Sequence, residues 1–155
     1  MTKKIQKQIT IWLTSACILI FLMIIIGGVT RLTRSGLSMV EWHPLSGIIP
    51  PISNAAWEEE FTKYQQFPEY QKINNQMTLD QFKFIFFWEY IHRLIARLLG
   101  ILFIIPFAYF CIKKQLKPPL TKKFLFMFFL GALQGLYGWY MVKSGLIDNP
   151  HVSHY

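Results

Sequence analysis

The sequence predicts an all-α membrane protein with three transmembrane helices. Of the 155 residues, 53% are hydrophobic and only 15% are charged, which is more typical of a membrane protein than of a soluble domain. Three apolar segments reach the roughly 20 residues that a helix needs to cross a membrane. These segments are residues 10–28, 82–112 and 124–142.

The first apolar segment follows a lysine-rich start, as the core of a secretory signal peptide does. Its length exceeds the ~7–15 residues of such a core, and no small-residue cleavage site follows it, so we expect a retained helix. No Arg- and Ser-rich transit peptide precedes it. This favours the inner membrane of a bacterium, with the mitochondrial inner membrane as the alternative.

Lysines predict how the chain lies in the membrane. Lys3, Lys4 and Lys7 precede the first span, and five more lysines occupy the link at residues 113–123. The positive-inside rule places the N-terminus and this link in the cytoplasm, and residues 29–81 in an outer loop. The formal net charge of +8 is then a topology signal, so we expect contact with membrane lipid and no nucleic-acid partner.

The outer loop is long enough to hold structure of its own. We expect Gly27 and Gly28 to end the first helix before it. Its prolines exclude a continuous helix over residues 44–51. Thr78 or Asp80 is expected to begin the second span.

A short amphipathic helix is expected inside the outer loop. Asn54 is the candidate N-cap. Trp57, Phe61 and Tyr64 recur at spacings of three and four residues, which places them along one helical face. Such a face can lie on the membrane surface.

The second span carries ionisable residues on one helical face, where their burial in lipid would be expensive. Offsets of three, four, seven and eleven residues place together Glu89, His92, Arg93, Ala96 and Gly100. One interpretation is an ion pair between Glu89 and Arg93 that only fixes helix packing. In that case His92 is a hydrogen-bonded core residue.

The other interpretation is a haem site. A neutral histidine nitrogen can ligate haem iron, so His92 is the candidate metal ligand, and the small residues that follow it leave room for a flat macrocycle. Arginine pairs with carboxylates such as haem propionates, which makes Arg93 and the neighbouring Arg97 candidates for cofactor binding. Glu89 would accept protons or orient the histidine.

Other polar residues are weaker candidates. Arg31 and Arg34 lie just outside the first span, where they either anchor at lipid headgroups or reach the propionates of a haem. His43 is expected on the surface of the outer loop. His151 and His154 are expected at an exposed chain end, with a metal pair as the alternative.

Two features of the spans have structural interpretations. Gln134, Gly135 and Gly138 in the third span are typical of close helix packing with an amide as a polar contact, and a substrate contact by Gln134 is the alternative. Cys17 and Cys111 are expected to be buried free thiols, because neither lies in the outer loop, where a disulfide would be useful.

Three stretches of the sequence carry a family resemblance. They are "GGVTRLTRSGLSMVEWHPLSGIIPP" from Gly27, "WEEEFTKYQQFPEY" from Trp57 and "MTLDQFKFIFFWEYIHRLIARLLG" from Met77. In this order they resemble the N-terminal half of haem A synthase, in its alphaproteobacterial and mitochondrial form. The resemblance runs from about Gly27 to the end of the chain.

This resemblance implies a membrane enzyme of eight helices in two similar four-helix bundles. It converts the C8 methyl of haem O to the formyl group of haem A by successive hydroxylations, and haem A serves cytochrome oxidase. The N-terminal bundle is expected to bind haem O, and the C-terminal bundle a haem b cofactor. The Glu-x-x-His-Arg motif of the family matches Glu89, His92 and Arg93, with the histidine as an axial ligand and the glutamate needed in the reaction.

Some features depart from the family. The chain ends at "HVSHY", where the family continues into a fourth helix with the partner axial histidine, so that ligand is expected beyond residue 155 rather than at His154. Position 96 is Ala where Gly is common, and the outer-loop cysteine pair of some bacterial members is absent. Without the C-terminal bundle, we expect an incomplete four-helix bundle from a fragment, a truncated product or a split protein, completed by a second chain or copy.

The first functional hypothesis is therefore haem A synthase acting on haem O. Glu89 is its catalytic residue and His92 its iron ligand. The residues expected near the propionates are Arg31, Arg34, Arg93 and Arg97. The alternative is a non-catalytic haem-binding or electron-transfer subunit of the membrane, and a third hypothesis is a structural remnant that binds no ligand.

Overall fold

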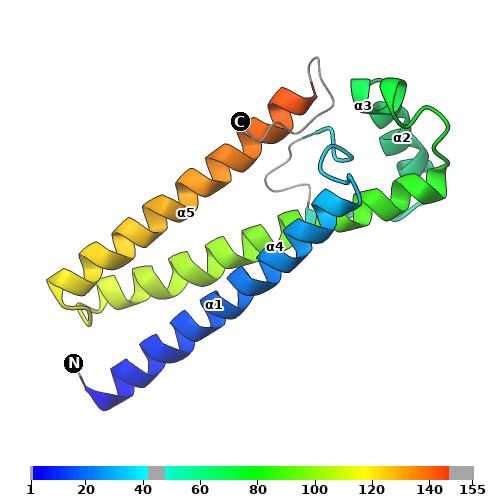
Figure 1. The fold of residues 1–155 in the computed structure, drawn as a ribbon. Coiled ribbons are helices and arrows are strands. Elements are labelled where there is room, and N and C mark those ends of the chain that lie inside the picture. The colour runs from blue at the N-terminus through cyan, green and yellow to red at the C-terminus, as the bar shows by residue number, and fades with distance from the viewer. Residues whose placement is uncertain (1, 42–47, 147–155) are drawn as a thin grey trace. The chain divides into compact units, whose positions relative to one another are not determined.

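The computed structural model describes residues 2–41 and 48–146, which fold into five helices with no strand (Figure 1). The helices are α1 (Lys3–Leu32), α2 (Asn54–Gln65), α3 (Pro68–Lys72), α4 (Leu79–Ile112) and α5 (Pro118–Gly145). Of these, α1, α4 and α5 are long and apolar enough to cross a membrane, and each contains one predicted span. The prediction of an all-α membrane protein is confirmed. The expectations for His43, His151 and His154 fall outside the described residues.

The chain divides into two compact units, and α1, α4 and α5 each contribute to both. We call residues 1–25 and 95–137 the aromatic unit, and residues 26–94 and 138–155 the loop unit. The names follow from what holds each unit together.

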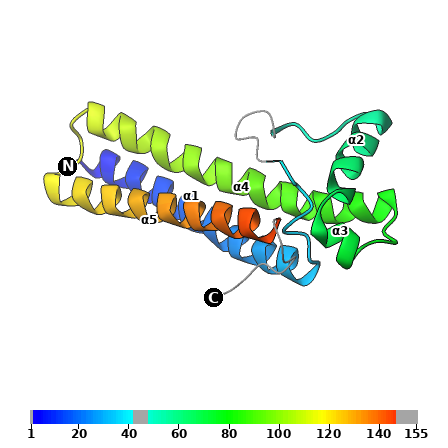
Figure 2. The same ribbon diagram turned by 90° about the horizontal axis from the view of Figure 1, so that it is seen from above.

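Aromatic rings around Trp12 form the core of the aromatic unit. The Trp12 ring lies 5.2–5.8 Å, between ring centroids, from Phe103 and Phe110 of α4 and Phe124 of α5. After the turn at residues 113–117, α5 returns antiparallel to the C-terminal part of α4 (Figure 2). Large apolar side chains on α5 remain exposed, as expected of a helix whose surroundings are lipid.

A hydrogen bond in the aromatic unit satisfies a backbone carbonyl of α4 that has no donor within the helix. Pro106 lies inside that helix and has no backbone N–H, so the carbonyl of Leu102 one turn earlier has no intrahelical donor. The indole Nε1 of Trp12 donates to this carbonyl over 2.8 Å. An unpaired backbone group in lipid costs several kcal/mol, so this contact fixes the position of α1 along α4.

The short helix α2 forms as expected, although its start and its partner differ from the prediction. Ser53, and not Asn54, is the N-cap, and its hydroxyl accepts from the backbone N–H of Ala56 at 3.2 Å. The apolar face packs on α4 instead of lying free for a membrane surface, because Tyr64 is fully buried against Phe82 of α4.

The first helix continues past the glycine pair. Gly27 and Gly28 lie inside α1 without a positive φ, so the prediction that they end the helix is wrong. The helix ends at Leu32 in a Schellman motif, in which the N–H of Ser35 donates to the carbonyl of Thr30 at 2.9 Å. Arg34 takes the left-handed position of this motif, with φ 52°, where glycine is usual.

Three further predictions concern the start of α4, the two cysteines and the packing of α5 beside Gln134. Thr78 begins α4 with a reciprocal capping box, since its N–H donates to the Gln81 side chain at 2.9 Å. Cys17 and Cys111 are free thiols as expected, but Cys17 is exposed and Cys111 partly exposed, so the prediction that they are buried is wrong. No described residue contacts the space where a Cβ at Gly135 would lie, so helix packing beside Gln134 is not found within the described residues.

Candidate functional site

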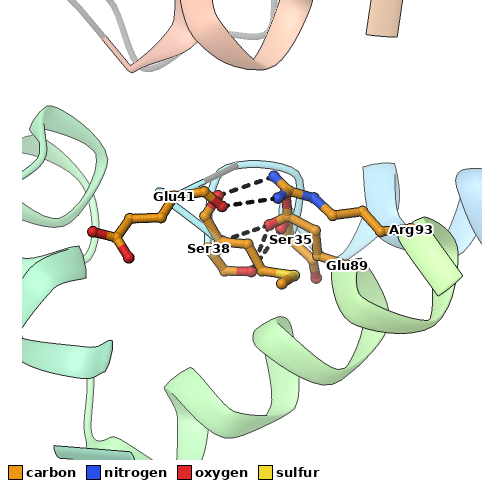
Figure 3. A network of polar contacts seen from close by, with 6 residues as sticks. Ser35, Ser38, Glu41, Glu89 and Arg93 are labelled. Carbon is orange, nitrogen blue, oxygen red and sulfur yellow. Dashed lines mark hydrogen bonds and ion pairs between the residues drawn. The ribbon is translucent and has the colours of Figure 1, made fainter. Parts of the chain in front are cut away.

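The buried carboxylate of Glu89 connects α4 to the segment that follows α1 (Figure 3). Its Oε2 accepts from the hydroxyl of Ser38 at 2.7 Å and from the backbone N–H of Met39 at 2.8 Å. Its Oε1 accepts from Nη2 of Arg93 at 2.5 Å. Both carboxylate oxygens therefore have donors from within the loop unit, although Glu89 is only 2% exposed.

Arg93 extends the same contact to two backbone carbonyls. Besides Glu89, its Nη2 donates to the carbonyl of Met39 at 2.9 Å, and its Nη1 donates to the carbonyl of Glu41 at 3.3 Å. The predicted ion pair is thus present, and it does more than join two turns of one helix. It holds residues 38–41 of the outer loop to α4.

The sequence around Ser35 suits this attachment. Ser35 and Ser38 are buried, and the Ser38 hydroxyl also lies 3.0 Å from the carbonyl of Ser35, which closes a tight turn. Leu37 between them is 1% exposed and packs on Gly145 of α5, where a Cβ would lie only 2.9 Å from its side chain. Polar and apolar side chains therefore alternate along this segment to face different neighbours.

His92 lies one turn after Glu89 and faces α1. A Cβ built on Gly27 would lie 3.3 Å from Nε2 of His92 and 3.7 Å from its Cδ2. Ala96 and Gly100, also on α4, belong to the aromatic unit; Ala96 is exposed, and a Cβ on Gly100 would meet nothing within 4 Å. The expected free surface for a flat ligand beside the histidine stays a prediction.

The four arginines of the prediction have different surroundings. The side chain of Arg93 is only 12% exposed and is bound to the outer loop. Arg31, in the last turn of α1, and Arg34, just beyond that helix, are both exposed in the loop unit. Arg97 belongs to the aromatic unit.

A second buried carboxyl group lies in the outer loop, and sequence reasoning missed it. Glu69 is 5% exposed, and the hydroxyl of the fully buried Tyr64 donates to its Oε2 at 3.2 Å. The side chain of Asn74 donates to the same hydroxyl at 2.8 Å. Burial raises the pKa of Glu69 to about 7, the negative charge of Glu89 adds to the rise, and the hydrogen bond from Tyr64 and the charge of Arg34 oppose it.

The donor set indicates which kind of metal group fits. Within residues 2–41 and 48–146, no three His, Cys, Asp or Glu side chains group together as a metal site. A bare metal ion needs several protein ligands, whereas a porphyrin supplies four nitrogens itself and needs one or two axial side chains. A single histidine beside a glycine without a side chain therefore fits the one side-chain ligand that a haem needs.

Comparisons with known proteins show the family of the chain. The family model for cytochrome oxidase assembly protein matches residues 10–155. The chain is 58% identical to the heme A synthase of Nitrosospira multiformis, over 97% of this chain and 42% of the relative. It is 54% identical to the heme A synthase of Flavobacterium psychrophilum, over 98% of this chain and 45% of the relative.

A third relative, the heme A synthase of Rickettsia canadensis, is 52% identical over 96% of this chain and 44% of its own length. The chain thus spans less than half the length of each of these three relatives. No solved structure matches the chain significantly.

Proposed function

The chain belongs to the cytochrome oxidase assembly protein family, and we propose that it forms the haem O-binding part of a haem A synthase. The relatives described above carry that name and are bacterial proteins, which supports a bacterial membrane as the location. The proposed reaction oxidises the C8 methyl of haem O to the formyl group of haem A. Haem O is the substrate, and haem b is proposed as a cofactor of the remainder of such an enzyme.

The observation that carries this proposal is the surroundings of His92. Its imidazole lies against Gly27 of α1, within the same unit. A core histidine that only packs has no need of a glycine on its neighbouring helix. A histidine that would hold a haem does, because a porphyrin is flat and wide.

The arginines divide into two proposed roles. Arg93 is already bound to Glu89 and to two carbonyls, so we assign it to holding the outer loop against α4. Arg31 and Arg34 are exposed at the outer end of α1 and are the better candidates for the two propionates of haem O. Arg97 is a further candidate on α4.

Glu89 is proposed to take up protons during methyl oxidation. Oxidising a methyl to a formyl group releases protons and electrons in equal number when water supplies the oxygen. A haem b or a quinone is the class of electron acceptor that we propose. Arg93 compensates the charge of the Glu89 carboxylate, and the Ser38 hydroxyl, 2.7 Å from Oε2, provides a path for a proton to reach it.

A second function is favoured by one observation, namely that every carboxylate oxygen of Glu89 already has a donor. Such a carboxylate is suited to fixing the outer loop and needs no part in chemistry. The chain would then bind haem through His92 without oxidising it, as a haem-binding or electron-transfer subunit. The two functions predict different products from the same variants.

The test is expression in a host that makes haem O but no haem A, followed by pyridine-haemochrome spectra and haem extraction. We expect haem in the wild type and its loss in His92→Ala. If Glu89 takes up protons, Glu89→Gln keeps haem O and forms no haem A, because the amide retains the shape and not the basicity. Unchanged haem content in His92→Ala would contradict the proposal.

The membrane orientation is proposed from charge alone. The lysines before α1 and those between α4 and α5 place both segments in the cytoplasm. The loop unit then lies toward the outer face, and haem O would bind near that surface. Cysteine labelling of residues 3–7 and 58–60 in intact spheroplasts separates the two orientations, because only outer residues react with an impermeant reagent.

A further inference from the structure

The two adjacent glycines inside α1 are unfavourable for a helix and so need an explanation from their surroundings. Gly27 and Gly28 lie inside a continuous helix, neither has a positive φ, and the helix ends at Leu32. Glycine inside a helix lowers helix stability by about 1 kcal/mol relative to alanine, so a structural role is expected to compensate for it. The two glycines differ in their surroundings, and that difference indicates the role of one of them.

Gly27 faces His92, whereas Gly28 faces no described atom. A Cβ at Gly27 would lie 3.3 Å from Nε2 of His92, which is closer than side chains normally approach, so the ring would have to move. A Cβ at Gly28 would meet nothing within 4 Å. The missing side chain at Gly27 therefore decides where the Nε2 edge of the imidazole lies.

Packing, and not hydrogen bonding, defines the orientation of this ring. Among residues 2–41 and 48–146, neither ring nitrogen of His92 has a hydrogen-bond partner, unlike its neighbours Glu89 and Arg93. Ligating histidines are usually oriented by a hydrogen bond to the second ring nitrogen. In this chain the described contact that limits how the ring can turn is the backbone of α1 at Gly27.

We propose that Gly27 is a positioning residue for His92: because Gly27 has no Cβ, the imidazole can lie against α1, and this contact sets how the ring is turned as a ligand of haem iron. This inference rests on the proposed function, because it assumes that His92 ligates haem. In this proposal Gly27 is neither an iron ligand nor a reacting group. It acts through the histidine, by leaving out the atom that would turn the ring away.

The experiment compares Gly27→Ala with Gly28→Ala in the full chain, expressed with haem O. Both changes add the same methyl to neighbouring positions of one helix, so their effects on helix propensity are matched. We expect Gly27→Ala to lower haem retention roughly tenfold to a hundredfold, the range found when a group that orients a metal ligand is lost. The haem that remains should show a shifted low-spin electron paramagnetic resonance spectrum, while Gly28→Ala keeps the wild-type content and spectrum.

A second measurement needs no haem. In the apoprotein, Gly27→Ala should lower the melting temperature when His92 is present and not when His92 is alanine, because the added methyl then meets no ring. Equal destabilisation in both backgrounds would mean that Gly27 only allows α1 to pack closely on α4, and would overturn the inference. A Gly27→Ala chain that fails to fold, but folds once His92→Ala is added, would support it.

The outcomes also separate this inference from the proposed function. Haem that persists in His92→Ala would remove the proposed function, and the role of Gly27 with it. Haem that depends on His92 but is indifferent to Gly27→Ala, in content and in spectrum, would leave the proposed function intact and overturn the inference alone.

Discussion

The aromatic unit and the loop unit handle buried polar groups in opposite ways. In the aromatic unit, the indole of Trp12 satisfies one backbone carbonyl, freed by Pro106, and apolar rings fill the rest of the core. In the loop unit, Glu89 and Arg93 bring charge into the core and use it to bind the backbone of an irregular segment. The first arrangement satisfies one backbone group of a helix, whereas the second attaches a loop segment to α4.

The difference follows from which backbone groups need hydrogen-bond partners in each unit. Helices α1, α4 and α5 satisfy their own backbone groups, so contacts between them can be apolar, as in the aromatic unit. The segment of residues 35–41 has no such ladder, so its N–H and C=O groups need partners from side chains. Glu89 and Arg93 supply an acceptor and donors, and the cluster next to His92 is fixed in place as a result.

The largest expected effect comes from removing one charge of this pair. Glu89→Ala should destabilise the chain by about 3–5 kcal/mol, because it leaves Arg93 buried without its counter-charge and Met39 without its acceptor. Unfolding in detergent measures the loss, and hydrogen exchange at Met39 should accelerate. Glu58→Ala, at an exposed position of α2, is the control and should change stability by less than about 0.5 kcal/mol.

The pair also predicts coupling between its members. Glu89→Ala and Arg93→Ala together should cost less than the sum of the single changes, because the double variant leaves no lone charge. Additive losses would mean that each side chain acts separately and that the attachment of the loop does not depend on the ion pair.

The next effect is a pH dependence confined to the loop unit. Folding raises the pKa of Glu69 from 4.5 to about 7, so the folded chain binds this proton more tightly than the unfolded chain does. Stability should therefore fall as pH rises from about 4.5 through about 7, by about 3 kcal/mol from this group, and then level off. Tyr64 and Asn74 form its hydrogen-bonded surroundings, and Glu89 and Arg34 are the nearby charges.

Melting curves between pH 5 and pH 8 measure this dependence, and Glu69→Gln is the matched variant. It keeps an oxygen for the Tyr64 hydroxyl but cannot ionise, so its stability should change less over the same range. At pH 8 it should be the more stable protein. A wild type and a variant with parallel pH profiles would show that Glu69 does not titrate in this window.

A smaller effect is expected from the hydrogen bond of Trp12 in the aromatic unit. Trp12→Phe keeps an aromatic ring among its neighbours but removes the donor to the Leu102 carbonyl, which should cost about 1–3 kcal/mol. Pro106→Ala supplies a backbone N–H to the same carbonyl. The double variant should therefore recover most of the loss, and a Pro106→Ala change that gives no recovery would assign the loss to ring packing.

Hydrophobic length and spacing predicted the three long helices and the shared face of Glu89 and His92, because both depend on local periodicity. The residues that Glu89 contacts could not be predicted in this way. Ser38 and Met39 lie some fifty positions earlier in the chain, and no local pattern specifies that they meet Glu89. The sequence offered one weak signal, the serines at positions 35 and 38 on either side of an apolar Leu37.

The end of α1 shows why local rules also failed. Glycine is the usual left-handed residue at a helix end, so Gly27 and Gly28 were the expected stop. The actual stop uses Arg34, since buried contacts of Ser35 and Leu37 beyond it hold the chain in that turn. Tertiary contacts outweigh the preference of one residue, and of the two glycines only Gly27 lies against His92.

The smallest effect compares the helix ends of the two units. Lys114, after α4, has φ 50° in the same motif that Arg34 forms after α1 with φ 52°. Replacing either residue with glycine relieves the left-handed conformation and should stabilise the chain by about 1 kcal/mol. Lys113→Gly is the control for the aromatic unit, because glycine there brings flexibility without relief.

The two substitutions should differ in one respect only. The positive charge of Arg34 lowers the pKa of Glu69, so Arg34→Gly should raise that pKa and carry the fall in stability to higher pH. Lys114→Gly relieves only the left-handed backbone conformation and should leave the pH dependence of stability unchanged. If both variants shift the profile equally, the charge of Arg34 does not act on the buried carboxyl. If only Arg34→Gly does, the exposed arginine that follows α1 is electrostatically coupled to the buried carboxyl of Glu69 in the loop unit.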